Sequence, residues 1–142
     1  MKRTIYLIFS FCLIITFTSC KKGCNDATAA NYDDKAKKND GSCYYEAKIS
    51  FWFSEGKSLS FIDGYGIESL SVFLDESQAG TIDPANWSVG PDCDGANFTV
   101  THNMGVDKEK NVNYMVNDQT GFTRYEGIIS LIAGDCINIQ LD

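Results

Sequence analysis

Histidine is almost missing from this chain, which leaves little room for catalysis that depends on it. The 142 residues contain one histidine, His102, and no C-x-x-C or H-E-x-x-H spacing that would indicate a zinc site. A Ser-His or Cys-His catalytic site would need His102, which we expect in a polar turn at residues 101–103. The sequence therefore predicts a protein that is not an enzyme.

Basic charge is also scarce. The chain has 12 lysine and arginine residues against 19 aspartate and glutamate residues, a net charge of −7. Such a surface repels the phosphates of nucleic acid and the headgroups of anionic lipid. We therefore expect no nucleic-acid partner, whereas divalent cations are compatible with this charge.

No apolar stretch is long enough to cross a bilayer, which takes about 20 residues. The longest, Ile5–Phe17, follows the basic pair Lys2-Arg3 and precedes small polar residues. This order predicts a cleaved export signal over residues 1–19. Its removal takes two basic residues and no acidic ones, which leaves 10 basic and 19 acidic groups and a net charge of −9.

Cys20 stands at the boundary of this leader. The segment Phe17-Thr18-Ser19-Cys20 resembles a bacterial lipobox, in which the cysteine takes a diacylglyceryl group and becomes the first residue. Phe17 replaces the usual leucine with another large apolar group. The resemblance implies a lipid anchor on Cys20 in the cell envelope. Ordinary secretory cleavage, which would leave Cys20 as a thiol, is the alternative.

The residues after Cys20 bear on the membrane that the lipid would enter. Lys21 and Lys22 would lie at the level of the lipid headgroups. In some bacteria an aspartate directly after the cysteine retains a lipoprotein in the inner membrane, and Lys21 is not an aspartate, so the resemblance implies the outer membrane. Surface lipoproteins of Bacteroidetes often carry acidic residues here. Their absence leaves both the periplasmic and the surface face open.

Four further cysteines remain in the exported chain: Cys24, Cys43, Cys93 and Cys136. An even number in an exported protein predicts disulfides, and three pairings are open. The stretch between Cys24 and Cys43 has too few apolar residues for a core. A Cys24–Cys43 bridge would compensate, and the turn at Asp40-Gly41 would bring Cys43 back.

Residues 23–44 carry a specific pattern, which fits at Gly23, Cys24, Asp26, Ala29, Asn31, Tyr32, Asp33, Ala36, Asn39, Asp40, Gly41, Ser42 and Cys43. It resembles a short module of Bacteroidetes envelope and secreted proteins. That module is often found beside, or likened to, calcium-binding acidic repeats of the thrombospondin type 3 kind. We expect the lipid anchor and the module together in residues 20–46, because the composition changes again at Ala47.

Calcium is one interpretation of the polar side chains in this module. Calcium takes about six to eight oxygen ligands, and the candidates are Asp26, Asn31, Asp33, Asp34, Asn39 and Asp40. The spacing of an EF-hand loop is absent, and Lys35, Lys37 and Lys38 neutralise much of the local charge. The alternative is that these side chains cap turns by bonding their own backbone.

Residues 47–142 alternate short apolar runs with turn signals. The runs are Ile49–Phe53, Leu59–Ile62, Leu70–Leu74, Ala79–Ile82, Phe98–Thr101, Val112–Val116, Phe122–Ile132 and Cys136–Leu141. About seven short strands of this kind predict a mainly β fold, an antiparallel β-sandwich that is Ig-like or transthyretin-like. We expect its core to be separate from the module, which offers the sheets no apolar stripe.

Several short motifs recur in this half. They are Phe51-Trp52, Val72-Phe73-Leu74-Asp75, Gly80-Thr81-Ile82, Pro91-Asp92-Cys93, Tyr125-Glu126-Gly127 and Gly134-Asp135-Cys136-Ile137-Asn138-Ile139-Gln140-Leu141. Together they resemble the domain that follows the same module in many Bacteroidetes lipoproteins. The resemblance implies pairing of Cys93 with Cys136, and hence of Cys24 with Cys43. It implies an envelope lipoprotein and no particular activity.

Three aromatic residues are candidates for a ligand platform: Trp52, Tyr65 and Trp87. Alternation puts Trp52 on the face opposite Phe51, and it is exposed if Phe51 is in the core. An outward aromatic residue that merely covers a sheet edge is the alternative.

We expect a non-enzymatic binding or scaffolding protein whose ligand is a glycan, a peptide or a partner protein. The alternatives are a calcium-dependent adhesion module and a small envelope hydrolase. The hydrolase would depend on His102 or on carboxylates such as Asp92 and Asp94.

Overall fold

The computed structural model describes residues 20–90, 93 and 98–142 of the chain, and strands dominate these residues. The predicted leader, residues 1–19, and the carboxylates Asp92 and Asp94 lie outside them. The elements are β1 (Lys22–Gly23), β2 (Lys38–Asn39), β3 (Tyr45–Trp52), α2 (Glu55–Leu59), η1 (Ser60–Gly64), β4 (Leu70–Leu74), β5 (Ser77–Ile82), β6 (Phe98–Gly105), β7 (Glu109–Asp118), β8 (Thr123–Ile132) and β9 (Cys136–Gln140). Within the described ranges no helix is long and apolar enough to span a membrane.

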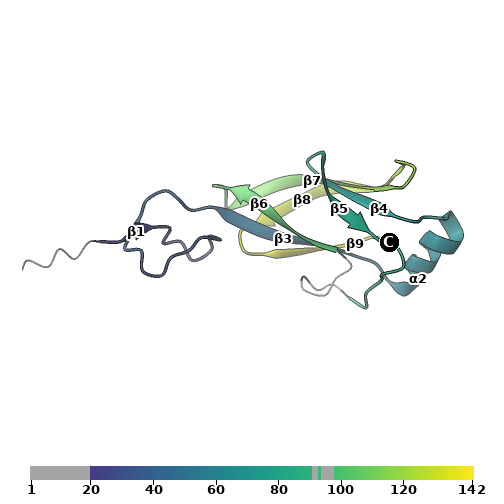
Figure 1. Ribbon diagram of the computed structural model, residues 1–142, viewed down its shortest axis with the longest axis horizontal. Helices are drawn as coiled ribbons and strands as arrows, with labels where there is room; N and C mark the ends of the chain where they lie inside the picture. The colour runs from purple at the N-terminus through teal and green to yellow at the C-terminus, as the bar shows by residue number, and fades with distance from the viewer. Residues whose placement is uncertain (1–19, 91–92, 94–97) are drawn as a thin grey trace, which may run out of the picture.

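Seven strands form two facing sheets, which confirms the predicted mainly β sandwich (Figure 1). The four-stranded sheet has the order β5-β4-β7-β8 and is antiparallel throughout. The three-stranded sheet has the order β6-β3-β9, in which β3 is antiparallel to β6 and parallel to β9. The parallel pair arises because β3 and β9 both leave the same end of the molecule, β9 after the tight turn that follows β8 (Figure 1).

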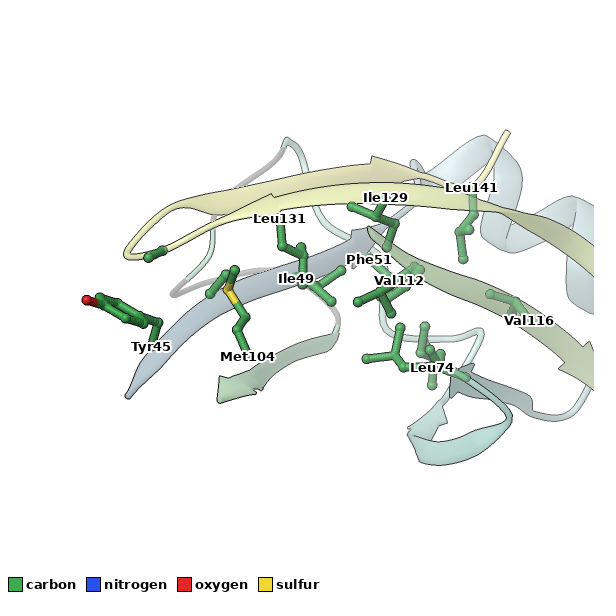
Figure 2. Close-up of a cluster of buried hydrophobic side chains, with 14 of the residues drawn as sticks. Tyr45, Ile49, Phe51, Leu74, Met104, Val112, Val116, Ile129, Leu131 and Leu141 are labelled. Atoms are coloured by element: carbon green, nitrogen blue, oxygen red, sulfur yellow. The ribbon is translucent and has the colours of Figure 1, made fainter. Parts of the chain in front are cut away.

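The core lies between the sheets, and side chains from both contribute to it (Figure 2). The alternation read from the sequence decides which residues enter it. The inward positions are Ile49 and Phe51 of β3, Leu70, Val72 and Leu74 of β4, Val112 and Val116 of β7, and Ile129 and Leu131 of β8. Each such side chain, when fully buried, contributes about 1.5–3 kcal/mol.

The expected strand at Leu59–Ile62 is wrong, because this segment is helical. Ser54 caps α2, its hydroxyl accepting the backbone N–H of Lys57 at 3.4 Å. The π-helical turn η1 then buries Phe61, whose ring meets Phe53 edge-on at a centroid distance of 5.2 Å. A short apolar run beside glycines does not distinguish a strand from a helical turn. The expected polar turn at residues 101–103 is also wrong, since these residues belong to β6.

The module does not have a separate core, contrary to expectation. Cys24, Ala29 and Cys43 belong to the same buried cluster as β3, which begins at Tyr45, at the end of the module. The sequence lacks an apolar stripe here, but a disulfide and one alanine suffice to continue the cluster. The predicted pairs Cys24–Cys43 and Cys93–Cys136 are both present, with Cα–Cα distances of 4.8 and 6.2 Å.

The molecule is elongated, with the module at one end and α2 at the other (Figure 1). β1 and β2 pair within the module, next to the start of the described chain, and the C-terminus lies near α2. Cys20 is a free, exposed cysteine two residues before β1, which lies at the module end (Figure 1). The sheets therefore lie to one side of Cys20, with the module between.

Candidate functional site

The side-chain oxygens of several predicted calcium ligands accept hydrogen bonds from the backbone of the module itself. Asp33 accepts the N–H of Lys35 at 3.0 Å, and Asp40 accepts that of Ser42 at the same distance. Asn39 accepts the N–H of Gly41 at 2.8 Å. Bonds from a side chain to the backbone two residues on are Asx turns, so the capping interpretation is confirmed for these residues.

Asn31 closes the module across a longer distance in sequence. Its amide nitrogen donates to the carbonyl of Ser42 at 2.7 Å, and its oxygen accepts the N–H of Tyr44 at 3.0 Å. Across residues 20–90, 93 and 98–142, no three histidine, cysteine or acidic side chains converge in a way that could hold a metal ion. Calcium binding therefore stays a prediction without a converging ligand set in this part of the chain.

Asp26, another of the candidate ligands, links the module to the sandwich. Its carboxylate pairs with the ammonium of Lys108 and accepts the hydroxyl of Tyr45 at 2.9 Å and that of Thr28 at 2.8 Å. The Lys108 ammonium also lies 5.5 Å from the centroid of the Tyr45 ring. The ion pair with Lys108, followed by the bonds from Thr28, lowers the pKa of Asp26. Asp26 is therefore ionised at neutral pH, and its carboxylate connects the module to Tyr45 and Lys108.

A cleft of about 760 Å³ lies at this junction, between module residues 27–30, the start of β3 and the turn at residues 133–136. Cys93 also lines it. The neighbours of Cys93, residues 91–92 and 94–97, fall outside the described part of the chain.

The three predicted platform residues lie in different parts of the structure. Trp52 ends β3 in the three-stranded sheet, and Trp87 precedes Ser88, whose N–H donates to Phe53. Tyr65 is 61% exposed and covers the guanidinium of Arg124 in the four-stranded sheet, at 5.1 Å from its ring centroid. No ring contact joins any two of the three within the described residues. A shared platform stays a prediction.

His102, on β6, faces a lysine. Its Nε2 lies 3.3 Å from the Nζ of Lys110. Burial lowers the pKa of His102, and the charge of Lys110 lowers it further, with Asp75 opposing. The ring is therefore neutral near pH 7. Among the described residues its side-chain hydrogen-bond partner is the ammonium of Lys110, which is not a nucleophile that a histidine could activate.

An open groove on the outer face of the four-stranded sheet is the site that sequence reasoning missed. Its volume is about 450 Å³, and its lining is Phe73, Glu76, Asn113, Tyr114, Met115, Glu126, Gly127 and Ile128. Phe73, Met115 and Ile128 occupy strand positions that alternate with buried ones, so their side chains face outward. Each of the three strands has an apolar residue at an outward position. Only the register of β4, β7 and β8 brings these residues together.

The register sets the layout of the groove. Phe73 of β4 stands opposite Met115 of β7, and Met115 stands opposite Glu126 of β8. In a neighbouring row Asn113 stands opposite Ile128, which is 71% exposed. Strands lie about 4.8 Å apart, so the row from Phe73 to Glu126 spans about 10 Å. The floor is apolar, and one end of the row is acidic.

The second acidic group comes from the turn between β4 and β5. Asp75 and Glu76 are its two central residues, and both have positive φ, 45° and 68°. Asp75 is held there because its carboxylate accepts the backbone N–H of Asn113 at 3.0 Å and its side-chain amide at 3.4 Å. Glu76 lines the groove from the left-handed conformation without such a bond among the described residues.

The groove is backed by tightly packed aromatic rings. Tyr114 points inward and meets Phe51 edge-on at a centroid distance of 5.7 Å. Gly127 stands opposite Tyr114, and a Cβ at this glycine would lie 2.7 Å from the ring. The absence of a side chain at Gly127 lets the ring lie against β8. The strand that carries Glu126 and Ile128 is therefore in close contact with the Tyr114 ring behind it.

Comparison with known proteins adds no family to this description. Family models, curated proteins and solved structures were each searched, and none matches the chain.

Proposed function

We propose that this protein is a lipid-anchored, non-enzymatic binding module of the bacterial cell envelope, held by Cys20 in the outer membrane. The resemblance of residues 17–20 to a bacterial lipobox motivates the anchor, and the module that resembles those of Bacteroidetes envelope proteins supports it. The disulfide-closed module serves as a rigid base, and the sandwich serves as the part that binds. The alternatives of a hydrolase and a calcium-dependent adhesion module receive less support from the geometry.

One observation carries the proposal: the module is fixed to the end of the sandwich that is nearest Cys20. Asp26 bonds to Tyr45 and Lys108, and the Cys24–Cys43 bridge belongs to the common buried cluster. A lipid on Cys20 would therefore hold the sheets away from the membrane at a fixed angle rather than on a loose tether. The outer groove would then stay accessible to a ligand.

The anchor is tested by lipid labelling of the full chain in a bacterial host. Cells expressing the chain are fed radiolabelled palmitate, and membranes are separated from soluble fractions. We expect label on the protein and its recovery in the outer membrane. Cys20→Ser should lose both, whereas Cys12→Ser, which changes a cysteine inside the leader, should lose neither. An unlabelled, soluble wild-type chain would refute the anchor.

The binding function is tested by screening the purified full chain against glycan and peptide arrays, with calcium and with a chelator. We expect calcium-independent binding. Binding that requires calcium would favour the adhesion alternative, and turnover of an arrayed glycan or peptide would favour the hydrolase.

A further inference from the structure

We propose that the outer groove of the four-stranded sheet binds a peptide segment of a partner protein in which a large apolar side chain is flanked by lysine or arginine. This inference rests on the proposed binding function and names its ligand class. The apolar part follows from Phe73 and Met115, which stand side by side, and from Ile128 in the neighbouring row. These partly exposed side chains offer a ligand a small apolar surface against which a large apolar group can be buried.

The basic part follows from the charges around the groove. Glu126 and Glu76 are its two charged lining residues, and both are acidic. Neither takes part in an ion pair between described residues. Two carboxylates beside an apolar floor attract a cation that carries an apolar group. Each would gain a partner when a lysine or arginine approaches.

The same charges argue against other occupants. A second copy of this chain would bring a further net charge of −9 once the leader is removed, and an anionic lipid surface would also be repelled. A glycan needs several convergent hydrogen-bonding groups. Apart from the two carboxylates, the groove offers the side chain of Asn113, and its amide nitrogen is already bonded to Asp75.

The conformation of Glu76 gives independent support. A two-residue hairpin turn with two positive φ values favours glycine at its second central position. Glu76 occupies that position at φ 68°, where a non-glycine residue is strained. Glu76 therefore lowers the stability of the turn. In return its carboxylate lies at the groove, where it could pair with a basic group of a ligand.

The test is a selection from a random heptapeptide phage library on the purified full chain. If the chain is lipidated it is reconstituted in phosphatidylcholine vesicles, and empty vesicles give the background. We expect enrichment of peptides that combine a large apolar residue with lysine or arginine. The best synthetic peptide is then measured by fluorescence anisotropy against variants. Because soluble and anchored protein can both be used, failure of the anchor and failure of the groove give different results.

Met115→Glu should weaken binding about tenfold or more, as should Glu76→Lys combined with Glu126→Lys. Glu109→Lys makes the charge change of one of these two substitutions, but on β7 about 13 Å along the strand from Asn113, and should leave affinity nearly unchanged. Glu76→Gly should weaken binding while the melting temperature stays equal or rises, which excludes misfolding as the cause. No enrichment, enrichment of peptides without basic residues, or equal binding to Met115→Glu overturns the proposal.

Discussion

Gly127 is the position where one added carbon should have the clearest effect. In Gly127→Ala the new Cβ would lie 2.7 Å from Cε1 of Tyr114 and 3.1 Å from Cζ and from the hydroxyl oxygen. The ring cannot simply swing away, because Phe51 packs against it and is completely buried. The substitution therefore overfills the space between β7 and β8.

The size of the effect follows from two opposing contributions. Overpacking of a core costs about 1–3 kcal/mol. Replacing glycine with alanine restricts the unfolded chain and returns about 0.4–1 kcal/mol. We expect Gly127→Ala to lower the free energy of unfolding by about 1–2 kcal/mol, which for a chain of this size is a fall of roughly 4–8 °C in melting temperature.

The assay is urea unfolding followed by tryptophan fluorescence, with thermal unfolding followed by circular dichroism. Gly56→Ala is the matched control, because Gly56 lies in α2 and a Cβ there meets nothing within 4 Å. That control should stabilise the protein by about 0.5–1 kcal/mol.

A double-mutant cycle with Tyr114→Leu separates the clash from other effects. Once the ring is shortened, Gly127→Ala should become nearly neutral, with a coupling of about 1 kcal/mol or more. If Gly127→Ala is as stable as the wild type and the cycle is additive, the packing argument is refuted.

Three further predictions concern charge, the disulfide and calcium. Hydrogen bonding from Thr120, with a further contribution from Arg124, lowers the pKa of Asp118 to about 2. The folded state thus favours the ionised carboxylate. The contribution of Asp118 to the stability of the folded state should be fully present above about pH 4, where the unfolded carboxyl ionises, and should be lost as the pH falls toward 2. Asp118→Asn should abolish this part of the acid dependence in urea titrations. Cys24→Ser combined with Cys43→Ser removes a disulfide with a sequence separation of 19 residues. It should lower the free energy of unfolding in urea by about 3 kcal/mol, and a loss below about 1 kcal/mol would contradict the chain-entropy argument. Isothermal titration of the oxidised full chain with millimolar calcium should give no binding heat, and a saturable signal would favour the adhesion alternative.

Local patterns predicted much of this fold correctly. Alternation identified the inward positions of β3, β4 and β7, because a strand sends successive side chains to opposite faces wherever it is placed. Side chains that cap turns at Asp33, Asn39 and Asp40 were one of the two interpretations of the module. They could be inferred from sequence because each bond reaches only two residues along the chain. The cysteine pairing came from resemblance, because four cysteines alone permit three pairings.

Other features could not be read locally. The segment at residues 59–62 has an apolar run that suits either a strand or a helical turn, and burial of Phe61 against Phe53 decided the outcome. The common core arises where Cys24, Ala29 and Cys43 join the buried cluster of the sandwich. Asp26 likewise pairs with Lys108, more than 80 residues later in the chain. Contacts of that kind leave no periodic trace in the sequence.

The sequence by itself determined which residues face inward, how the module turns and, by resemblance, where a lipid would attach, because each depends on neighbours in the chain. Only the tertiary structure decided that β9 runs parallel to β3 and that Phe73, Met115 and Ile128 form one groove with acidic groups beside it. A register between strands is fixed by packing over the whole domain, and a shift of one residue would send every one of these side chains to the opposite face.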